Sequence, residues 1–157
     1  MQDGDPKLPS IIASHIYTMV ALSAIAALLV ATLNSYTTTL KTTSEIEQLK
    51  NLLSHVAAKG NELLTVAKVT NSTARLFLQL PTAIGYQQYW MRANNDSSNA
   101  WIEGSLGQIT GYSAPYRVFL PIGTAASGDF IGGYGAAVLD SYLNGSTPQL
   151  RLGSLGG

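Results

Sequence analysis

Hydrophobic side chains follow three different spacings along this chain, and each spacing predicts a different kind of element. From Ile11 to Leu33 the sequence is apolar almost throughout for 23 residues. A helix that crosses a membrane needs roughly 20 apolar residues, so this run predicts a transmembrane helix or a helix in the core of an assembly. A secretory signal would have a shorter apolar core behind a basic start. The residues before the apolar run include two acidic side chains, Asp3 and Asp5, and one basic side chain, Lys7. The chain therefore does not have a basic start, and we expect the helix to be retained.

The second spacing, from Ser44 to Val69, is that of an amphipathic helix. Neither Pro nor Gly interrupts residues 34–43 before it, so the helix can continue from the apolar run. Charged residues occupy one side of this helix, and the apolar stripe on the other side could pack on the chain's own later domain or on neighbouring copies. The stripe has heptad spacing: Ile46, Leu49, Leu53, Val56, Gly60 and Leu63. Because Gly costs about 1 kcal/mol in a helix relative to Ala, Gly60 predicts a contact too close for a Cβ.

The third spacing begins at Thr70, where apolar and polar residues alternate and short runs are separated by Gly, Ser, Asn and Pro. This pattern is typical of a small antiparallel sheet or sandwich. The predicted strand runs are 76–80, 84–90, 100–103, 106–110, 116–120, 136–142 and 149–152. A short helix is the alternative for 136–143, and the glycine-rich segment 128–135 is expected to be a flexible surface loop.

These spacings predict an α+β fold with four parts. Residues 1–10 form a polar N-terminal segment, 11–33 a transmembrane or filament-core helix, 34–69 its amphipathic continuation, and 70–157 a β-rich head domain.

Composition narrows the function. Only 11% of the residues are charged, against about 25% in a typical soluble domain, so a membrane segment, a glycan coat or contacts between subunits must cover part of the surface. The net charge is zero, which argues against nucleic acid as a partner. The absence of cysteine excludes disulfides and thiol catalysis.

Residues that could carry chemistry are sparse. His15 and His55 lie forty residues apart on one helix, which predicts packing or interfacial roles and no metal site. Ser113, within Gly111-Tyr-Ser-Ala-Pro115, lacks the last Gly of a nucleophile elbow. Aromatic residues that could stack on sugars are expected instead to fill the core: Tyr86, Tyr89, Trp90 and Trp101. The sequence predicts no catalytic, cofactor or metal site, and hence no enzyme.

Three sequons bear on the side of the membrane that the head occupies. Asn71, Asn95 and Asn144 each begin an Asn-X-Ser/Thr motif at an expected loop, so they are candidates for N-linked glycosylation outside the cell. Chance matches are the alternative, because Asn, Ser and Thr are abundant. The distribution of Lys7, Lys41 and Lys50 weakly favours the opposite orientation.

Several motifs resemble the archaeal branch of the type IV pilin-like proteins. A strand ends in Leu80-Pro81, Ile84-Gly85 and an aromatic strand at Tyr89 follow, and a later strand closes with Leu120-Pro121. The resemblance implies a long N-terminal helix followed by a β head, in a homo-oligomeric extracellular filament whose hydrophobic helices pack as the core. Each subunit would lie in the membrane before assembly. Small residues around Ala24 and Ala27 would permit close helix contacts, with the amphipathic stripe as further packing candidates.

The residues before the apolar run leave an alternative open. Precursors in that family usually carry a basic residue and a small residue just before the hydrophobic run, at the prepilin processing site. Here that place reads Asp5-Pro-Lys-Leu-Pro-Ser10, which gives no recognisable processing site. The alternative function is therefore a single-pass, membrane-anchored ectodomain that binds the cell envelope, like a stator or a minor pilin.

Overall fold

The computed structural model describes residues 8–109 and 114–155 of the chain. Its first element, α1 (Leu8–Thr70), is a helix of 63 residues, so the segment 34–43 does continue the helix as the sequence indicated. The chain divides into two compact units, Met1–Thr43 and Ser44–Gly157, and each is described by itself. The motif around Ser113 lies outside the described residues.

The first unit is the N-terminal stretch of α1. Ala and Leu dominate residues 21–33 and favour helix, whereas the Thr-rich residues 34–43 favour it less. Hydroxyl groups in both parts are satisfied within the helix, because each donates to the backbone carbonyl four residues earlier at 2.8–3.1 Å. The hydroxyls belong to Thr18, Ser23, Thr32, Thr37, Thr38, Thr39 and Thr42. These side chains therefore do not need water to complete their hydrogen bonds.

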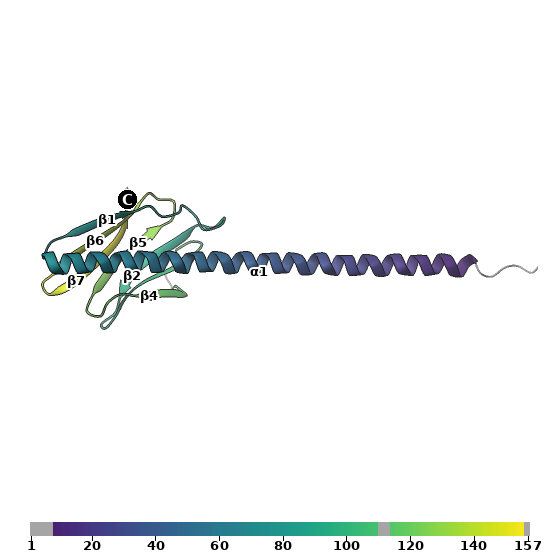
Figure 1. Ribbon diagram of the computed structural model, residues 1–157, viewed down its shortest axis with the longest axis horizontal. Helices are drawn as coiled ribbons and strands as arrows, with labels where there is room; N and C mark the ends of the chain where they lie inside the picture. The colour runs from purple at the N-terminus through teal and green to yellow at the C-terminus, as the bar shows by residue number, and fades with distance from the viewer. Residues whose placement is uncertain (1–7, 110–113, 156–157) are drawn as a thin grey trace, which may run out of the picture. The chain divides into compact units, whose positions relative to one another are not determined.

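The second unit combines the rest of α1 with one seven-stranded sheet, and we call it the head (Figure 1). Its strands are β1 (Ala74–Leu78), β2 (Tyr89–Asn95), β3 (Ala100–Leu106), β4 (Tyr116–Phe119), β5 (Ala125–Ile131), β6 (Ala137–Asn144) and β7 (Thr147–Ser154). The order across the sheet is β1-β6-β7-β5-β2-β3-β4, and only the β5–β7 pair is parallel. The α+β prediction is confirmed, with a single sheet in place of a sandwich.

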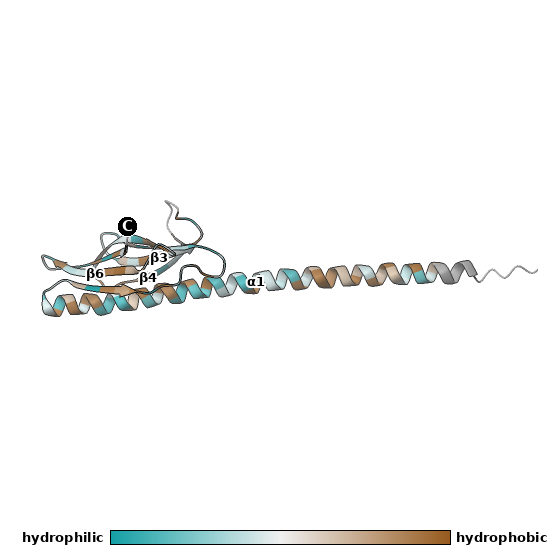
Figure 2. Cartoon of the chain, turned by 90° about the horizontal axis from the view of Figure 1, so that it is seen from above, coloured by the Kyte–Doolittle hydropathy of each residue, from teal (hydrophilic) through white to brown (hydrophobic). Residues whose placement is uncertain are grey.

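The core of the head lies between α1 and one face of this sheet (Figure 2). Leu49, Leu53 and Val56 on α1 are all 0% exposed. They pack with inward-facing strand residues such as Met91 and Ile102 in one cluster. Burying a Leu or Val side chain stabilises a fold by about 1.5–3 kcal/mol, so this stripe fixes the helix on the sheet.

Two strand predictions between residues 79 and 115 are wrong. Residues 84–87 form a turn closed by an isolated bridge between Ile84 and Gln87, because Gly85 adopts a positive φ of 60° and the alternation of 84–90 becomes a strand only from Tyr89 onward. Residues 106–109 are not a separate strand either, since β3 ends at Leu106 and a turn at Gly107, with φ of 89°, follows. Residue 110 of that predicted run lies outside the described residues.

The structure decides two expectations about residues 128–143. The strand predicted at 136–142 is confirmed by β6, and the alternative of a short helix over 136–143 is wrong. The glycine-rich segment 128–135 is a loop only in its second half, because Gly128–Ile131 belongs to β5. A Cβ on Gly128 would lie 2.0 Å from the Leu152 carbonyl oxygen. This glycine therefore permits the close approach by which β5 pairs with β7 up to Gly128 and with β2 from Asp129.

Candidate subunit-packing surface and modification sites

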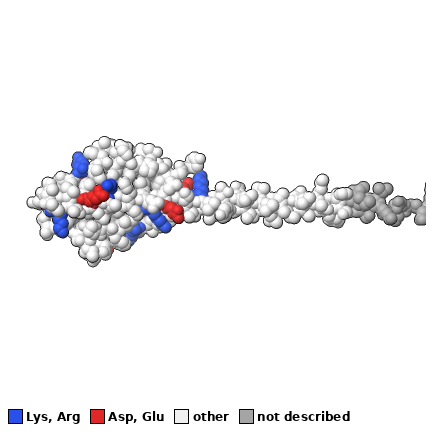
Figure 3. Space-filling view, viewed as in Figure 1, with Lys and Arg blue, Asp and Glu red and all other residues white. Residues whose placement is uncertain are grey.

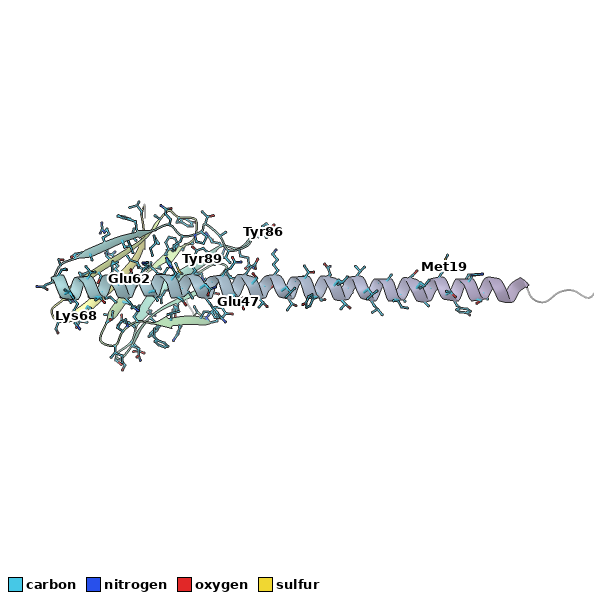
Figure 4. All side chains as sticks on the ribbon, in the orientation of Figure 1. Met19, Glu47, Glu62, Lys68, Tyr86 and Tyr89 are labelled. Atoms are coloured by element: carbon cyan, nitrogen blue, oxygen red, sulfur yellow. The ribbon has the colours of Figure 1, made fainter. Side chains whose placement is uncertain are left out.

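The N-terminal stretch of α1 has an apolar surface that no other described part of the chain covers. Every residue from Ala13 to Thr43 is exposed, including Met19, whose side chain projects from the helix in Figure 4. Lys41 is the single Lys, Arg, Asp or Glu between Leu8 and Thr43, and Figure 3 shows the charged side chains gathered on the head. The large apolar residues are Ile16, Tyr17, Met19, Val20, Leu22, Ile25, Leu28, Leu29, Val30, Leu33, Tyr36 and Leu40, at 53–76% exposure.

One face of this stretch is lined by small side chains. At 100° per residue, Ala24, Ala27 and Ala31 point in nearly the same direction, and the same face continues into a shallow groove. The groove has a volume of about 540 Å³ and is lined by Ala31, Asn34, Ser35, Thr38 and Thr39. Ala26 lies nearly opposite Ala24. Ala24 and Ala27 were predicted from the sequence, but the groove was not. The signal for it in the sequence is the seven-residue spacing from Ala24 to Ala31 and on to Thr38.

The packing candidates in the second stretch of α1 have a different environment. Leu49, Leu53, Val56 and Leu63 are at most 8% exposed because they pack on the head's own sheet. Ile46 is half-buried. Of the two partners that the sequence left open, the stripe therefore contacts the chain's own β domain.

Gly60 makes the close contact that its place in the stripe predicted. A Cβ added at this position would lie 2.7 Å from Cδ2 of Leu150, a β7 residue that is itself 1% exposed. That separation is well inside the normal contact distance of about 3.5–4 Å between carbon atoms. The glycine therefore lets α1 approach β7 within the core of the head.

The three sequon asparagines are all exposed, but their surroundings differ. Asn71 follows the last residue of α1 with a positive φ of 49°, a common way to end a helix. Asn144 is the last residue of β6, beside the Gly145 turn. Asn95 ends β2, where its Oδ1 accepts a hydrogen bond from the Ala126 N–H at 3.2 Å.

Three of the four aromatic residues that the sequence assigned to the core are buried, and the prediction is wrong for Tyr86. Tyr89, Trp90 and Trp101 are 0%, 1% and 8% exposed, whereas Tyr86 is 90% exposed. The Tyr89 hydroxyl donates to the Pro81 carbonyl at 2.7 Å, and burial raises the pKa of Tyr89 to about 12. The buried rings offer no stacking surface for a sugar.

The sheet face away from α1 carries a row of alternating charges that the sequence pattern did not predict. The row contains one residue from each of four neighbouring strands, paired in register: Asp129, Arg92, Glu103 and Arg117. Glu103 is only 1% exposed. It accepts a hydrogen bond from Trp101 Nε1 at 2.9 Å and forms an ion pair with Arg117 Nε at 3.1 Å. Sequence alone could reveal this row only with the strand pairing already known.

The described residues contain no group of three His, Cys, Asp or Glu side chains that could hold a metal ion. His15 and His55 are both exposed. No known protein family, no curated protein and no solved structure matches the chain.

Proposed function

We propose that this chain is a structural subunit of an extracellular filament, in which the N-terminal stretches of α1 from many copies pack together and the heads lie outside. One observation carries the proposal. In the candidate membrane span of α1 the most apolar window has no buried residue within the chain, although the head buries most of its own apolar stripe. A helix that is apolar all round needs an apolar environment, which either lipid or other copies can supply.

Residues 34–43 favour other copies over lipid alone. They extend the helix by about 15 Å beyond the apolar run, yet five of these ten residues are Thr, a residue with only modest helix propensity. If the chain were a single membrane anchor, this stretch would be exposed to water without a packing partner. Most helical stability in proteins comes from such packing. Tyr36 and Leu40, at 63% and 53% exposure, give neighbouring helices apolar surface to cover.

The small-residue face supports close contact between the copies. Small residues let helix backbones approach in apolar surroundings, where dispersion and not water exclusion drives association. The internally bonded hydroxyls of Thr37, Thr38 and Thr39 also remove the cost of burying an unsatisfied polar group. A contact between two different patches of identical subunits generates an open helical assembly when the rotation does not close.

The test compares assembly of the full chain with two variants that add equal bulk at two positions. In Ala24→Leu the new side chain fills the small-residue face, whereas in Ala26→Leu it lies on the nearly opposite side. Filaments sheared from cells are counted by electron microscopy and identified by mass spectrometry. We expect at least a tenfold loss of filaments for Ala24→Leu and near-normal numbers for Ala26→Leu.

Two results would contradict the proposal. One is absence of the wild-type chain from every sheared filament while it stays wholly in the membrane fraction. The other is cross-linking in intact cells only to unlike envelope proteins. Both results favour the alternative of a single-pass, membrane-anchored ectodomain that binds the envelope.

A further inference from the structure

Segments that are far apart in the sequence meet at the end of the head where α1 terminates. Strand β1 starts at Ala74 opposite Ser141, which places Asn71 and Asn144, each three residues further on, at the same end of the sheet. The Asn95 side chain reaches the start of β5 at Ala126, and β5 runs parallel to β7 from that end. In Figure 4, Lys68 marks this end of the head and Tyr86 marks the opposite one.

The segments that meet there are made almost wholly of Asn, Ser and Thr. Residues 70–73, 94–99 and 144–147 contain one charged side chain, Asp96. Its Oδ1 accepts from the backbone N–H groups of Ser98 and Asn99, both at 2.7 Å, and these bonds lower the pKa of Asp96. Apart from the Asp96 carboxylate and Lys68, this end of the head therefore presents neutral hydroxyl and carboxamide groups.

The three sequon side chains at this end are not equally available. Both polar atoms of Asn95 are engaged, because Oδ1 accepts from Ala126 and Nδ2 donates to the Asp96 carbonyl at 3.3 Å. Asn71 and Asn144 are exposed and make no side-chain hydrogen bond within residues 8–109 and 114–155. A carboxamide must leave its hydrogen-bond partners to enter the active site of a glycosylating enzyme. Asn95 would lose two hydrogen bonds in this way, whereas Asn71 and Asn144 would lose none.

We propose that Asn71 and Asn144 are N-glycosylated and that Asn95 is not, so that carbohydrate covers the end of the head where α1 terminates. The donor is an oligosaccharide linked through phosphate to a polyisoprenoid lipid. The Nδ2 atom bonds to the anomeric carbon, the bond between that carbon and the phosphate oxygen breaks, and the Nδ2 proton is released as the lipid phosphate leaves. The inference rests on the proposed function in placing the head outside the membrane, where such transfer occurs.

Glycans would also supply the hydration that this low-charge surface lacks. The described part of the head carries 14 Lys, Arg, Asp and Glu residues in 108 positions, about half the usual share. Several of these charges are already used internally, as in the Arg75–Asp140 and Arg117–Glu103 pairs. A bulky, solubilising modification on the surface fits an end that has few charges of its own.

The experiment maps glycopeptides of the full chain produced in a host that N-glycosylates exported proteins. We expect glycans on the Asn71 and Asn144 peptides at more than half occupancy and less than a tenth on the Asn95 peptide. Thr73→Ala and Ser146→Ala remove each sequon while keeping its asparagine, and each should remove one glycan mass. Ser97→Ala is the matched control and should leave the total mass of glycan unchanged.

A glycan on Asn95, or unmodified Asn71 and Asn144 peptides, would overturn this inference. Biotinylation of Lys59 in intact cells separates the two proposals. A labelled, unglycosylated chain found in filaments refutes the glycan inference alone. A glycosylated chain that never enters filaments refutes the filament proposal alone. A chain that is neither labelled nor glycosylated refutes both proposals.

Discussion

The two stretches of α1 are parts of one helix, yet their apolar side chains have opposite surroundings. Between Ala13 and Thr43 every residue is exposed, whereas between Ser44 and Thr70 the stripe through Leu53 is buried on the sheet. The sequences differ in one respect that explains this. The second stretch has charged residues on its outer face, while the first has Lys41 as its single charged residue and is apolar almost throughout up to Leu33. An amphipathic helix needs one apolar partner, and a helix without a polar face needs an apolar environment on all sides.

The largest expected effect comes from removing the same side chain in each stretch. Leu53→Ala takes a side chain of 0% exposure out of the core and should destabilise the head by about 2–5 kcal/mol. Leu29→Ala, at 59% exposure, should change the free energy of unfolding of the head by less than about 0.5 kcal/mol. Urea unfolding followed by tryptophan fluorescence measures both. Equal losses would mean that the two stretches do not differ as described.

A second test asks how close α1 comes to the sheet. Gly60→Leu places a large side chain where even a Cβ would lie 2.7 Å from Leu150 Cδ2, and we expect a loss of about 1–3 kcal/mol from overpacking. Thermal unfolding of the head measures this loss of stability. The control is Gly60→Ala, which gains about 1 kcal/mol of helix propensity but forces Leu150 to move, so its net effect should be mildly harmful.

A double-mutant cycle isolates that contact. In a Leu150→Ala background the obstructing Cδ2 atom is gone, so Gly60→Ala should become stabilising by about 1 kcal/mol. If Gly60→Ala stabilises the wild-type chain just as much, the glycine is not needed for close approach.

The third test compares how a buried and an exposed tyrosine affect the stability of the head at alkaline pH. Because burial raises the pKa of Tyr89 to about 12 from about 10 in the unfolded chain, its contribution to stability is complete below pH 10. That contribution is lost as the pH rises towards 12, where the unfolded chain releases the proton more readily. Tyr89→Phe should cost about 0.5–1.5 kcal/mol at neutral pH, through the lost bond to Pro81, and should flatten this alkaline decline. Tyr36→Phe, on the exposed stretch, should leave the pH curve of head unfolding unchanged.

The smallest expected effect lies on the outer face of the second stretch. Lys59 Nζ and Glu62 Oε2 are 2.8 Å apart, with side chains 36% and 63% exposed. An exposed pair of this spacing contributes about 0.3–0.5 kcal/mol, so Glu62→Gln should lower the free energy of unfolding by no more than that at low salt and by less at 1 M salt. A loss above about 1 kcal/mol would show that this face of the helix is not simply solvated.

Most of the fold follows from local patterns in the sequence. The helix was expected to reach Val69 and ends at Thr70, and the runs at 116–120 and 149–152 fall in β4 and β7. Strand β5 was missed because Gly128, which marks a change of pairing partner in the sheet, looks like loop punctuation in the sequence. Local patterns cannot show which distant strand a residue approaches.

The same limit applies to the candidate sites. An apolar stripe such as Leu49–Leu63 suits its own sheet and a neighbouring copy equally well, so only the folded head decides between them. The row from Asp129 to Arg117 and the meeting of Asn71 with Asn144 both depend on strand register. The small face at Ala24 could be found earlier because it lies within a single helix.

The strand order of the head has a consequence for its synthesis. Ala74 in β1 pairs with Ser141, and Leu150 in β7 packs under Gly60, so the buried face of α1 has no complete partner until the last strand leaves the ribosome. At about 5–20 residues per second, the roughly 100 residues after Val56 take about 5–20 s to be made. During that interval the N-terminal stretch of α1 has already been synthesised, whereas the head is still unfolded. The order of elements along the chain thus completes the exposed apolar stretch of α1 before the head can fold.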